Sequence, residues 1–219
     1  MNFSAFANND PRWVWTLNWD QITPRILIGS CPMSGGDLQR ISVEARVTAV
    51  LSLQHDLCHA HLGIDYEGLR RDGARLGLEL VRHPIRDFDA ADARRQLPGA
   101  VRALDGLLER HERVYVHCTA GMGRAPLTVL GYLTLIHGTL FEEALALLRA
   151  RRPMVCPNIE AYRACRDDLI DRHGDAIARR LGDSEQSEPH ANSAQRRRQA
   201  ELEILRQALR HADRIAVRP

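Results

Sequence analysis

Short apolar segments alternate with amphipathic segments along most of this chain. Segments rich in isoleucine, valine and leucine predict strands at 25–30, 48–54, 78–85 and 114–116. Hydrophobic residues recur at helical spacing between them and predict helices at 37–47, 64–76 and 97–111, the last with Pro98 in its first turn. Strands that alternate with helices are typical of parallel βαβ units. We therefore predict an α/β fold with a central, mostly parallel sheet flanked by helices.

After the last predicted strand the pattern is helical. Residues 126–136 are apolar on nearly every side, which predicts a helix buried in the core, and 141–151 and 158–172 predict two more helices. Residues 182–195 are polar without apolar periodicity and are typical of a linker. The segment 195–212 has leucines on one helical face, which predicts an amphipathic helix that either folds back on its own domain or supports self-association.

All three tryptophans, Trp13, Trp15 and Trp19, lie within seven residues, and their even spacing predicts a strand. One interpretation is an edge strand that covers the core, since large aromatic side chains are mostly buried. The other is an exposed aromatic platform for a sugar or a protein partner. The spacing alone leaves both open.

The charge of the chain is close to balanced. The formal net charge of +2 and the pI near 8.4 argue against a nucleic acid or an anionic membrane as partner. All 30 residues counted as lysine plus arginine are arginines, so chemistry that requires a lysine nucleophile is excluded.

The cysteines indicate a reducing compartment. There are five, at scattered spacings, without a Cys-x-x-Cys pair or the pattern of a zinc site, so we expect neither a disulfide framework nor a metal cofactor. The N-terminal residues lack the basic start and apolar core of a secretory signal, and no apolar run has membrane-spanning length. We therefore expect a soluble, cytoplasmic protein.

Residues 114–126 carry the strongest chemical signal. Cys118 follows an apolar strand, glycines interrupt the next residues, and Arg124 stands where an apolar helix begins. The thiolate is the nucleophilic form of cysteine, and a helix N-terminus or a nearby arginine stabilises it. Backbone N–H groups between Thr119 and Arg124 are able to surround phosphoryl oxygens, and the guanidinium supplies a planar fork for two of them. The stretch predicts a phosphate-binding loop with a cysteine nucleophile, a phosphocysteine intermediate and no metal.

Such chemistry also needs an acid to protonate the leaving oxygen. Asp87, Asp89 and Asp92 follow the preceding predicted strand, and composition does not distinguish them. His117 is interpreted as a residue that orients the loop. The loop residues expected to contact the phosphate are His117, Thr119, Ala120, Gly121, Met122 and Gly123.

Residues 117–124 match the His-Cys-x5-Arg signature of protein tyrosine phosphatases and resemble the dual-specificity group in particular. Further pieces are similar to the plant starch phosphatases, which are glucan phosphatases related to laforin. The resemblance covers roughly residues 13–172. The pieces that carry the narrower resemblance are Ala125-Pro126, residues 86–90, residues 18–32 and residues 62–65.

The resemblance implies roles for individual residues. It implies Cys118 as nucleophile, Arg124 as phosphate clamp and Asp87 as general acid, and it nominates Phe88 as an aromatic residue beside the bound glucan. Trp19 is a further candidate for substrate binding. Most dual-specificity enzymes have serine or threonine where this chain has Ala125, and the glucan branch shares the alanine. Plant members have aromatic residues where this chain has 61–62 and 134–136, so part of their sugar-stacking surface is missing here.

These observations favour a metal-independent phosphatase acting on a phosphorylated, starch- or glycogen-like glucan. In the alternative hypothesis the protein is a phosphatase with the same chemistry, but its substrate is a phosphoprotein, a phosphoinositide or an RNA phosphate. A third hypothesis is a non-catalytic phosphate-binding scaffold. The predicted organisation is a flexible leader at 1–12, a dual-specificity phosphatase catalytic domain at 13–178, a linker at 179–194 and a C-terminal amphipathic helix at 195–213.

Overall fold

The structure, a computed structural model, describes residues 15–187 and 192–211. Its centre is one five-stranded sheet with the order β1-β2-β5-β3-β4. β1 pairs antiparallel with β2, and the remaining pairs are parallel, which confirms the predicted mostly parallel α/β sheet. The strands are β1 Trp19–Thr23, β2 Ile26–Gly29, β3 Ala49–Gln54, β4 Glu79–Ile85 and β5 Val114–His117.

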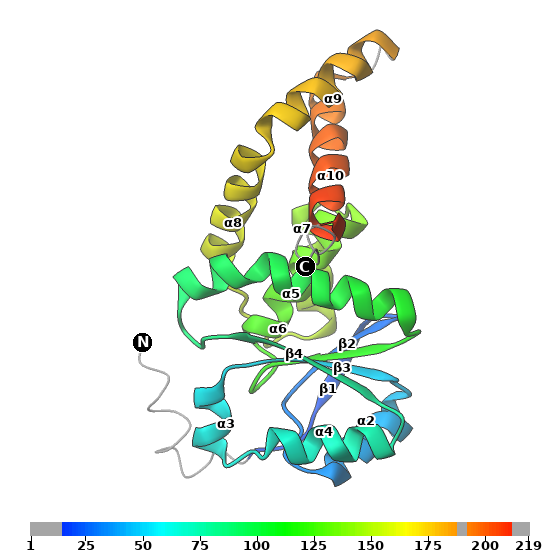
Figure 1. The fold of residues 1–219 in the computed structure, drawn as a ribbon, viewed down its shortest axis with the longest axis vertical. Coiled ribbons are helices and arrows are strands. Elements are labelled where there is room, and N and C mark those ends of the chain that lie inside the picture. The colour runs from blue at the N-terminus through cyan, green and yellow to red at the C-terminus, as the bar shows by residue number, and fades with distance from the viewer. Residues whose placement is uncertain (1–14, 188–191, 212–219) are drawn as a thin grey trace, which may run out of the picture.

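Helices cover both faces of this sheet (Figure 1). One face carries α2 Gly35–Ala45, α3 Asp56–Leu62 and α4 Tyr66–Arg75. The other carries α5 Ala90–Arg110, α6 Arg124–Gly131 with its π-helical continuation η1 Tyr132–His137, α7 Phe141–Arg151 and α8 Ile159–Arg172. Beyond α8, α9 Gly174–Ser187 extends away from the sheet and α10 Ser193–His211 returns beside it (Figure 1).

Alternation along the buried strands produces two apolar clusters, one on each face. Ile28, Leu51 and Val116 point into the larger cluster beneath α5 and α6. Their neighbours Leu27, Val50 and Tyr115 point into the smaller cluster against α2 and α4. Since successive side chains of a strand face opposite sides of a sheet, strands buried on both faces are apolar throughout.

The helix α5 begins at Ala90, well before the predicted start at residue 97. Asp89 caps it, because its Oδ1 accepts a hydrogen bond from the Asp92 N–H at 2.8 Å. Pro98 consequently lies inside the helix and not in its first turn. The predicted start at residue 97 is therefore wrong, because the capping side chain of Asp89 begins the helix and Pro98 is accommodated inside it.

The tryptophan segment is only partly a strand. β1 begins at Trp19, residues 15–18 precede it as irregular backbone, and Trp13 lies outside the described residues. Trp15 and Trp19 are half-buried and pack against the smaller apolar cluster. Trp19 meets Tyr115 edge to face, with ring centroids 6.3 Å apart. These two tryptophans therefore cover the core.

The C-terminal region differs from the predicted linker and appendage. Helix α9 continues to Ser187, so the first part of the 179–194 linker is helical, while 188–191 lie outside the described residues. The helix is supported by α10, which packs against it, and by the ion pair between Arg180 and Glu203 at 2.8 Å. Tertiary packing of this kind stabilises helices whose own sequence is a weak helix signal.

Helix α10 folds back on the domain, which is one of the two alternatives for this segment. Leu205 and Leu209 are 2% exposed and belong to the larger core cluster. Arg210 pairs with Asp105 of α5 through contacts of 2.8 and 3.0 Å. The leucine face is thus used within the chain, and self-association through α10 would have to use its other face.

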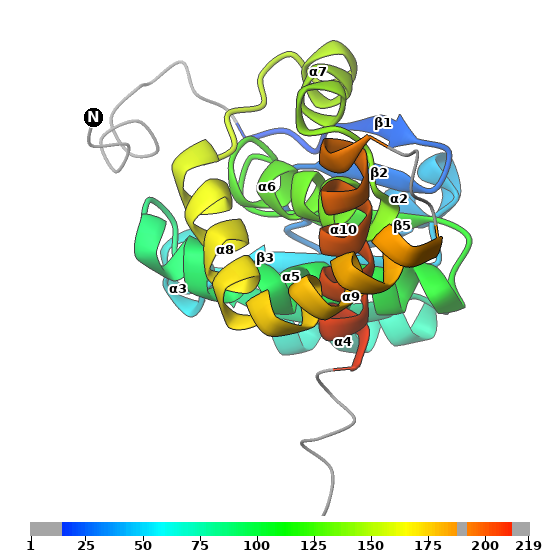
Figure 2. The same ribbon diagram turned by 90° about the horizontal axis from the view of Figure 1, so that it is seen from above.

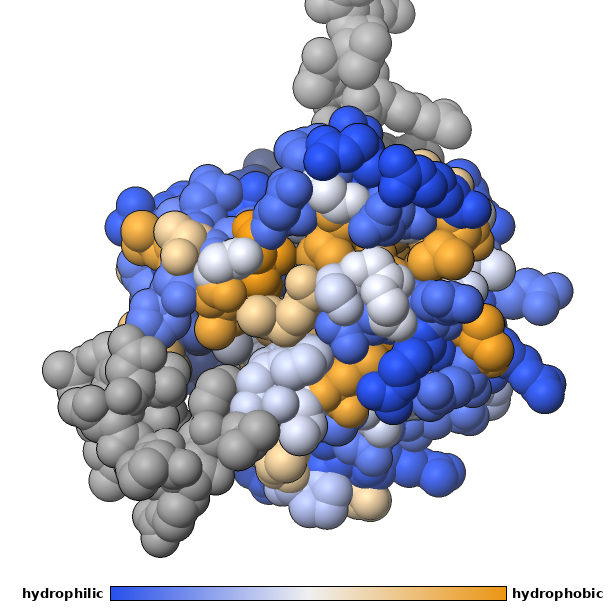
Figure 3. Space-filling view, turned by 90° about the horizontal axis from the view of Figure 1, so that it is seen from below, coloured by the Kyte–Doolittle hydropathy of each residue, from blue (hydrophilic) through white to orange (hydrophobic). Residues whose placement is uncertain are grey.

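The face formed by α2, α3 and α4 is mostly hydrophilic, with hydrophobic areas separated by polar side chains (Figure 3). Val43 and Leu57 are among the exposed apolar residues of these helices. Within the part of the chain that the structure describes, no helix combines the length and apolarity needed to cross a membrane.

Candidate active site

The cysteine loop lies at the carboxyl edge of the central strand. His117, the last residue of β5, is paired with Gly29 of β2 and Ser52 of β3, so three parallel strands end together at this point. The loop 118–123 follows, and α6 begins at Arg124. Ligands bind at this edge in open α/β sheets. Cys118 is 4% exposed and is held at the base of the loop.

The carbonyl groups of the loop are bound from outside it. Four consecutive carbonyls each accept a hydrogen bond from another segment. They are the carbonyls of Thr119 (from the Cys31 N–H, 2.9 Å), Ala120 and Gly121 (from the Arg152 guanidinium, 2.9 Å each) and Met122 (from the Cys156 N–H, 2.7 Å).

The N–H groups of the same loop are left available. Across residues 15–187 and 192–211, none of the hydrogen bonds has an N–H of residues 119–123 as its donor. Successive N–H groups at a helix N-terminus form a site for an anion. The external bonds to the carbonyls hold the peptide units in this orientation, so the loop is arranged as an anion receptor.

The two loop glycines differ in what they do. Gly121 has a φ of +68°, and a Cβ there would lie 2.4 Å from the Gly29 carbonyl oxygen, so only glycine fits. Gly123 is the N-cap of α6 with a φ of −109°, and a Cβ there would meet only the Cys156 oxygen at 3.9 Å. Only Gly121 is therefore required by the backbone conformation of the loop.

Arg124 is buried at the start of α6, with 5% of its surface exposed. Its Nη1 donates to the Ile85 carbonyl at 3.0 Å and contacts the Cys58 sulfur at 3.3 Å. Its Nη2 donates to the Thr119 hydroxyl at 3.1 Å. Its Nε is buried and, among the described residues, has no hydrogen-bond partner. Because an unpaired buried donor is costly, this N–H is suited to an acceptor from outside the chain, such as a phosphoryl oxygen.

The structure distinguishes the three candidate aspartates, Asp87, Asp89 and Asp92, by their contacts. Asp87 Oδ2 lies 2.5 Å from Arg124 Nη2 at the mouth of the loop. Asp89 is the N-cap of α5. Asp92 is 5% exposed, accepts the Arg86 N–H at 2.7 Å and pairs with Arg95. Asp87 is therefore the one of the three that reaches the arginine of the loop.

The two aromatic candidates for substrate binding have different surroundings. Phe88 is 71% exposed beside Asp87 and has a φ of +56°. Aromatic residues rarely adopt this left-handed conformation, and strained residues of this kind cluster at functional sites. Trp19 instead packs on Tyr115 and the smaller core cluster. The structure places Phe88 next to Asp87 and packs Trp19 on the core.

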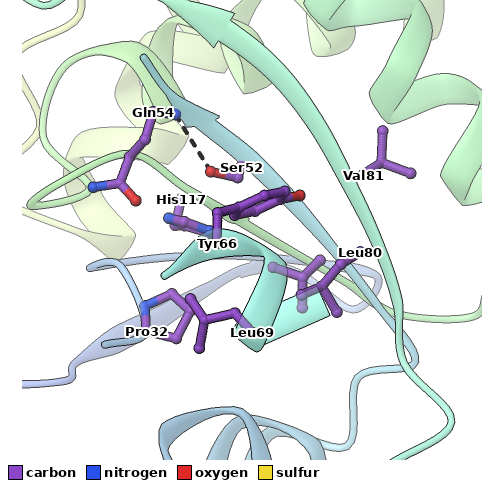
Figure 4. A pocket seen from close by; sticks show the side chains of 9 residues that line it. Pro32, Ser52, Gln54, Tyr66, Leu69, Leu80, Val81 and His117 are labelled. Atoms are coloured by element: carbon purple, nitrogen blue, oxygen red, sulfur yellow. Dashed lines mark hydrogen bonds between the residues drawn. The ribbon is translucent and has the colours of Figure 1, made fainter. Parts of the chain in front are cut away.

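His117 is buried behind the loop. Its Nδ1 donates to the Cys118 carbonyl at 3.0 Å. Its ring lines a small cavity of about 10 Å³ together with Tyr66 and Ser52, on the α4 side of the sheet (Figure 4). Burial lowers the pKa of His117 to about 4. The imidazole is therefore neutral at pH 7 and holds the Cys118 carbonyl. Its ring is 3% exposed and lies behind the loop, away from the position expected for a phosphate contact.

This low pKa predicts a pH-dependent stability. The unfolded chain protonates His117 below about pH 6.5, whereas the native protein does so only near pH 4, so stability falls as the pH drops through this window. We expect a loss of about 2 kcal/mol in unfolding free energy between pH 7 and pH 5 from this residue. Urea unfolding at both pH values measures it. His117→Asn should show a smaller loss, and the exposed-site control His61→Asn should show the full loss; equal losses in the two variants would contradict the assignment.

Arg152 is a residue of the site that the sequence analysis missed. It is 1% exposed and joins the outer side of the loop to the segment around β1. Besides the loop carbonyls, its guanidinium donates to Asp20 Oδ2 at 2.7 Å and to Asn18 Oδ1 at 2.8 Å. The sequence marks it only as an arginine directly before Pro153, and its partners lie between 31 and 134 residues away in the chain. It is a positioning residue, because it holds the loop carbonyls outward.

We expect Arg152→Met to lower kcat/KM by about 10²-fold, because loss of the guanidinium frees the Ala120 and Gly121 carbonyls to turn. Arg152→Lys should recover only part of this activity, since an ammonium lacks the planar fork that reaches all its partners. The affinity for vanadate should fall in parallel with activity. Arg151→Met, at the exposed neighbouring position, is the matched control. Unchanged vanadate affinity in a folded Arg152→Met protein would refute the positioning role.

Comparison with known proteins agrees with this geometry. Residues 45–166 match the model of the dual specificity phosphatase catalytic domain. The chain belongs to the dual specificity phosphatase family, as the resemblance of its cysteine loop implied. It is 33% identical over 156 residues to phosphoglucan phosphatase DSP4, amyloplastic, of Castanea sativa, covering 70% of this chain and 41% of that protein. It is 28% identical over 171 residues to laforin of Mus musculus, covering 72% and 51%.

The chain thus spans about half or less of the length of these curated relatives. Solved structures support the fold. The crystal structure of PTPMT1 aligns with a TM-score of 0.56 at 20% identity, over 68% of this chain and 91% of that one. The active form of Tk-PTP aligns with a TM-score of 0.56 at 23% identity, over 68% and 94%. The predicted fold class is therefore confirmed.

Proposed function

We propose that this protein is a cysteine-dependent phosphatase that hydrolyses phosphate monoesters, with phosphorylated glucan as its substrate. One observation carries the chemistry: the loop carbonyls of 119–122 are all bound outward, while the N–H groups of 119–123 and the Nε of Arg124 have no partner among the described residues. Cys118 stands at the base of this receptor. The arrangement suits a tetrahedral anion with a thiolate below it.

The proposed reaction has two steps. In the first, the Cys118 thiolate attacks phosphorus, the bond from phosphorus to the leaving oxygen breaks, and Asp87 transfers a proton to that oxygen. The loop N–H groups and Arg124 hold the phosphoryl oxygens and stabilise the transition state. In the second, Asp87 takes a proton from a water molecule that attacks phosphorus, the phosphorus–sulfur bond breaks, and phosphate leaves while Cys118 returns to the thiolate.

The ion pair between Asp87 and Arg124 links substrate binding to proton transfer in the first step. Nη2 of Arg124 contacts Asp87 at 2.5 Å and also donates to Thr119 of the loop. A bound phosphate therefore competes with Asp87 for this atom. The consequence is that the carboxyl group is released next to the leaving oxygen when substrate binds.

Support for the glucan substrate comes from the relatives and from Phe88. The curated proteins of Castanea sativa and Arabidopsis thaliana are named phosphoglucan phosphatases. Phe88 presents an exposed aromatic ring beside the acid, and such rings stack on sugar faces. Trp19 is not used in this proposal, because its ring covers the core.

The substrate test compares phosphate release from solubilised phosphorylated amylopectin, phosphopeptides and phosphoinositides at equal enzyme. We expect the glucan to be preferred, and Phe88→Ala to lower glucan turnover about tenfold while hydrolysis of an aryl phosphate changes little. Val43→Ala removes an exposed apolar side chain of α2 and is the control. Preference for a phosphopeptide, a phosphoinositide or an RNA phosphate would replace the glucan proposal by the corresponding alternative and leave the phosphatase chemistry intact.

We also propose a reducing, cytoplasmic location. In the described part of the chain all five cysteines are free thiols, and Cys118 must be reduced to act. The two plant relatives carry amyloplastic and chloroplastic in their names, which applies to those proteins.

A further inference from the structure

A second and larger cavity, of about 330 Å³, is lined in part by α10. Figure 2 shows how α10 lies across the top of the domain. The walls of the cavity come from η1, the connection 138–140, the start of α7, α8 and α10. None of its lining residues belongs to the cysteine loop. Its volume falls in the range of small-molecule sites. Helix α10 lies outside residues 45–166, which match the family model, so part of the cavity wall comes from outside the matched domain.

The floor of the cavity is apolar. Leu135 and Leu205 are buried beneath it, and Leu140 and Leu202 line it at partly exposed positions. Phe141 adds an aromatic ring, which already stacks on Tyr162 with centroids 5.2 Å apart. An occupant therefore meets mainly hydrocarbon at the base of the cavity.

The hydroxyl groups of the lining already have partners. The Tyr162 hydroxyl donates to Thr134 Oγ1 at 2.8 Å, and Thr134 in turn donates to the Leu130 carbonyl at 2.8 Å. Thr139 Oγ1 lies 3.1 Å from His137 Nδ1. A sugar needs many hydrogen-bond partners, and this lining offers few that are unoccupied. The cavity is therefore a poor glucan site.

The rim of the cavity carries excess positive charge. Arg163, Arg166 and Arg198 line it, and Glu201 is the acidic residue among the lining side chains. Glu201 already pairs with Arg166 at 2.5 Å and with Arg197 at 3.0 Å. Arg198 donates to the Gly138 carbonyl at 2.7 Å, and the Arg163 guanidinium lies 5.8 Å from the centre of the Phe141 ring. Neither Arg163 nor Arg198 has an acidic partner among the described residues.

From the apolar floor and the cationic rim we infer that this cavity binds a small amphiphilic anion. Its hydrocarbon body lies on the leucines, and its carboxylate or phosphorus-containing head group pairs with Arg163 and Arg198. The inference does not depend on the proposed phosphatase reaction, because no residue of the cysteine loop takes part.

Isothermal titration of the whole 219-residue chain with decanoate and with decylphosphonate, both below their micelle concentrations, tests the site. We expect saturable binding with one ligand per chain. Shortening decanoate to octanoate should weaken binding about 15-fold, since each buried methylene contributes about fourfold. Decanol, which lacks the charge, and acetate, which lacks the hydrocarbon body, should bind at least tenfold more weakly than decanoate. Tighter binding of decanoate would indicate a fatty carboxylate, and tighter binding of decylphosphonate a phosphorylated lipid.

The double variant Arg163→Gln with Arg198→Gln should lose at least tenfold in affinity for both charged probes. Both residues are exposed, so folding is expected to persist, and circular dichroism checks it. Arg179→Gln, an exposed arginine of α9 outside the cavity, should leave binding unchanged. Equal affinity for decanol and decanoate, full affinity in the double variant, or displacement of decanoate by vanadate would each overturn the inference, the last because it would place the ligand in the cysteine loop.

Discussion

Replacing Cys118 by serine is expected to reduce hydrolysis of an aryl phosphate by more than about 10³-fold. The serine hydroxyl has nearly the same size but is not ionised at neutral pH, so the nucleophile is lost while the loop keeps its shape. The N–H groups of residues 119–123 and Arg124 do not depend on the sulfur atom. The variant should therefore still bind vanadate, and its unfolding free energy should stay close to that of the original protein.

Steady-state kinetics with and without a chelator, together with vanadate titration, measures these effects. Cys156→Ser is the matched control, because Cys156 is an exposed cysteine whose only described link to the loop is its backbone N–H. This control should keep full activity. Substantial activity in Cys118→Ser, or a requirement for added metal in the original protein, would reject the phosphocysteine mechanism.

Replacing Asp87 by asparagine is expected to lower kcat by about 10² to 10³-fold. Its carboxyl group stands beside the guanidinium that holds the phosphate, at 2.5 Å from Arg124 Nη2, and asparagine keeps the shape but has no proton to transfer. The loss should be largest for substrates with a poor leaving group, such as an alkyl or sugar phosphate. It should be small for an aryl phosphate whose leaving oxygen needs little protonation.

The neighbouring aspartates are internal controls for this prediction. Asp89→Asn should be nearly neutral for activity and stability, since asparagine caps a helix about as well as aspartate. Asp92→Asn should destabilise the protein, because the buried carboxylate accepts the Arg86 N–H and pairs with Arg95. A larger loss of kcat in Asp89→Asn than in Asp87→Asn would show that Asp89, and not Asp87, is the general acid.

The local features of this protein were predictable because the interactions that cause them are close in sequence. The Ile- and Val-rich strands, the buried helix after the loop and the Cys118 to Arg124 spacing depend on neighbouring residues, and the structure confirms the strands and the helix. The start of α5 is also a local feature, but two local signals for it compete. Asp89 is a helix cap and Pro98 is typical of a first helical turn, and the helix begins after Asp89.

Other features depend on contacts between distant segments. Arg152 reaches the loop carbonyls and Asp20, and Asp87 reaches Arg124, only because the sheet order brings these segments to one edge. No periodicity or spacing in the chain encodes such pairs. The surroundings of Trp19 are a further example. The spacing of the tryptophans did not distinguish a residue that covers the core from one on an exposed aromatic platform.

By itself, then, the sequence determined the alternation of strands and helices and the residues that could form a phosphate loop, since both follow from short-range sterics and hydrophobic periodicity. The tertiary structure alone decided which aspartate faces Arg124, what holds the loop carbonyls outward, and that α10 folds back to enclose a second cavity. These depend on burial and on charges paired across long sequence separations, and such pairs exist only once the chain has packed.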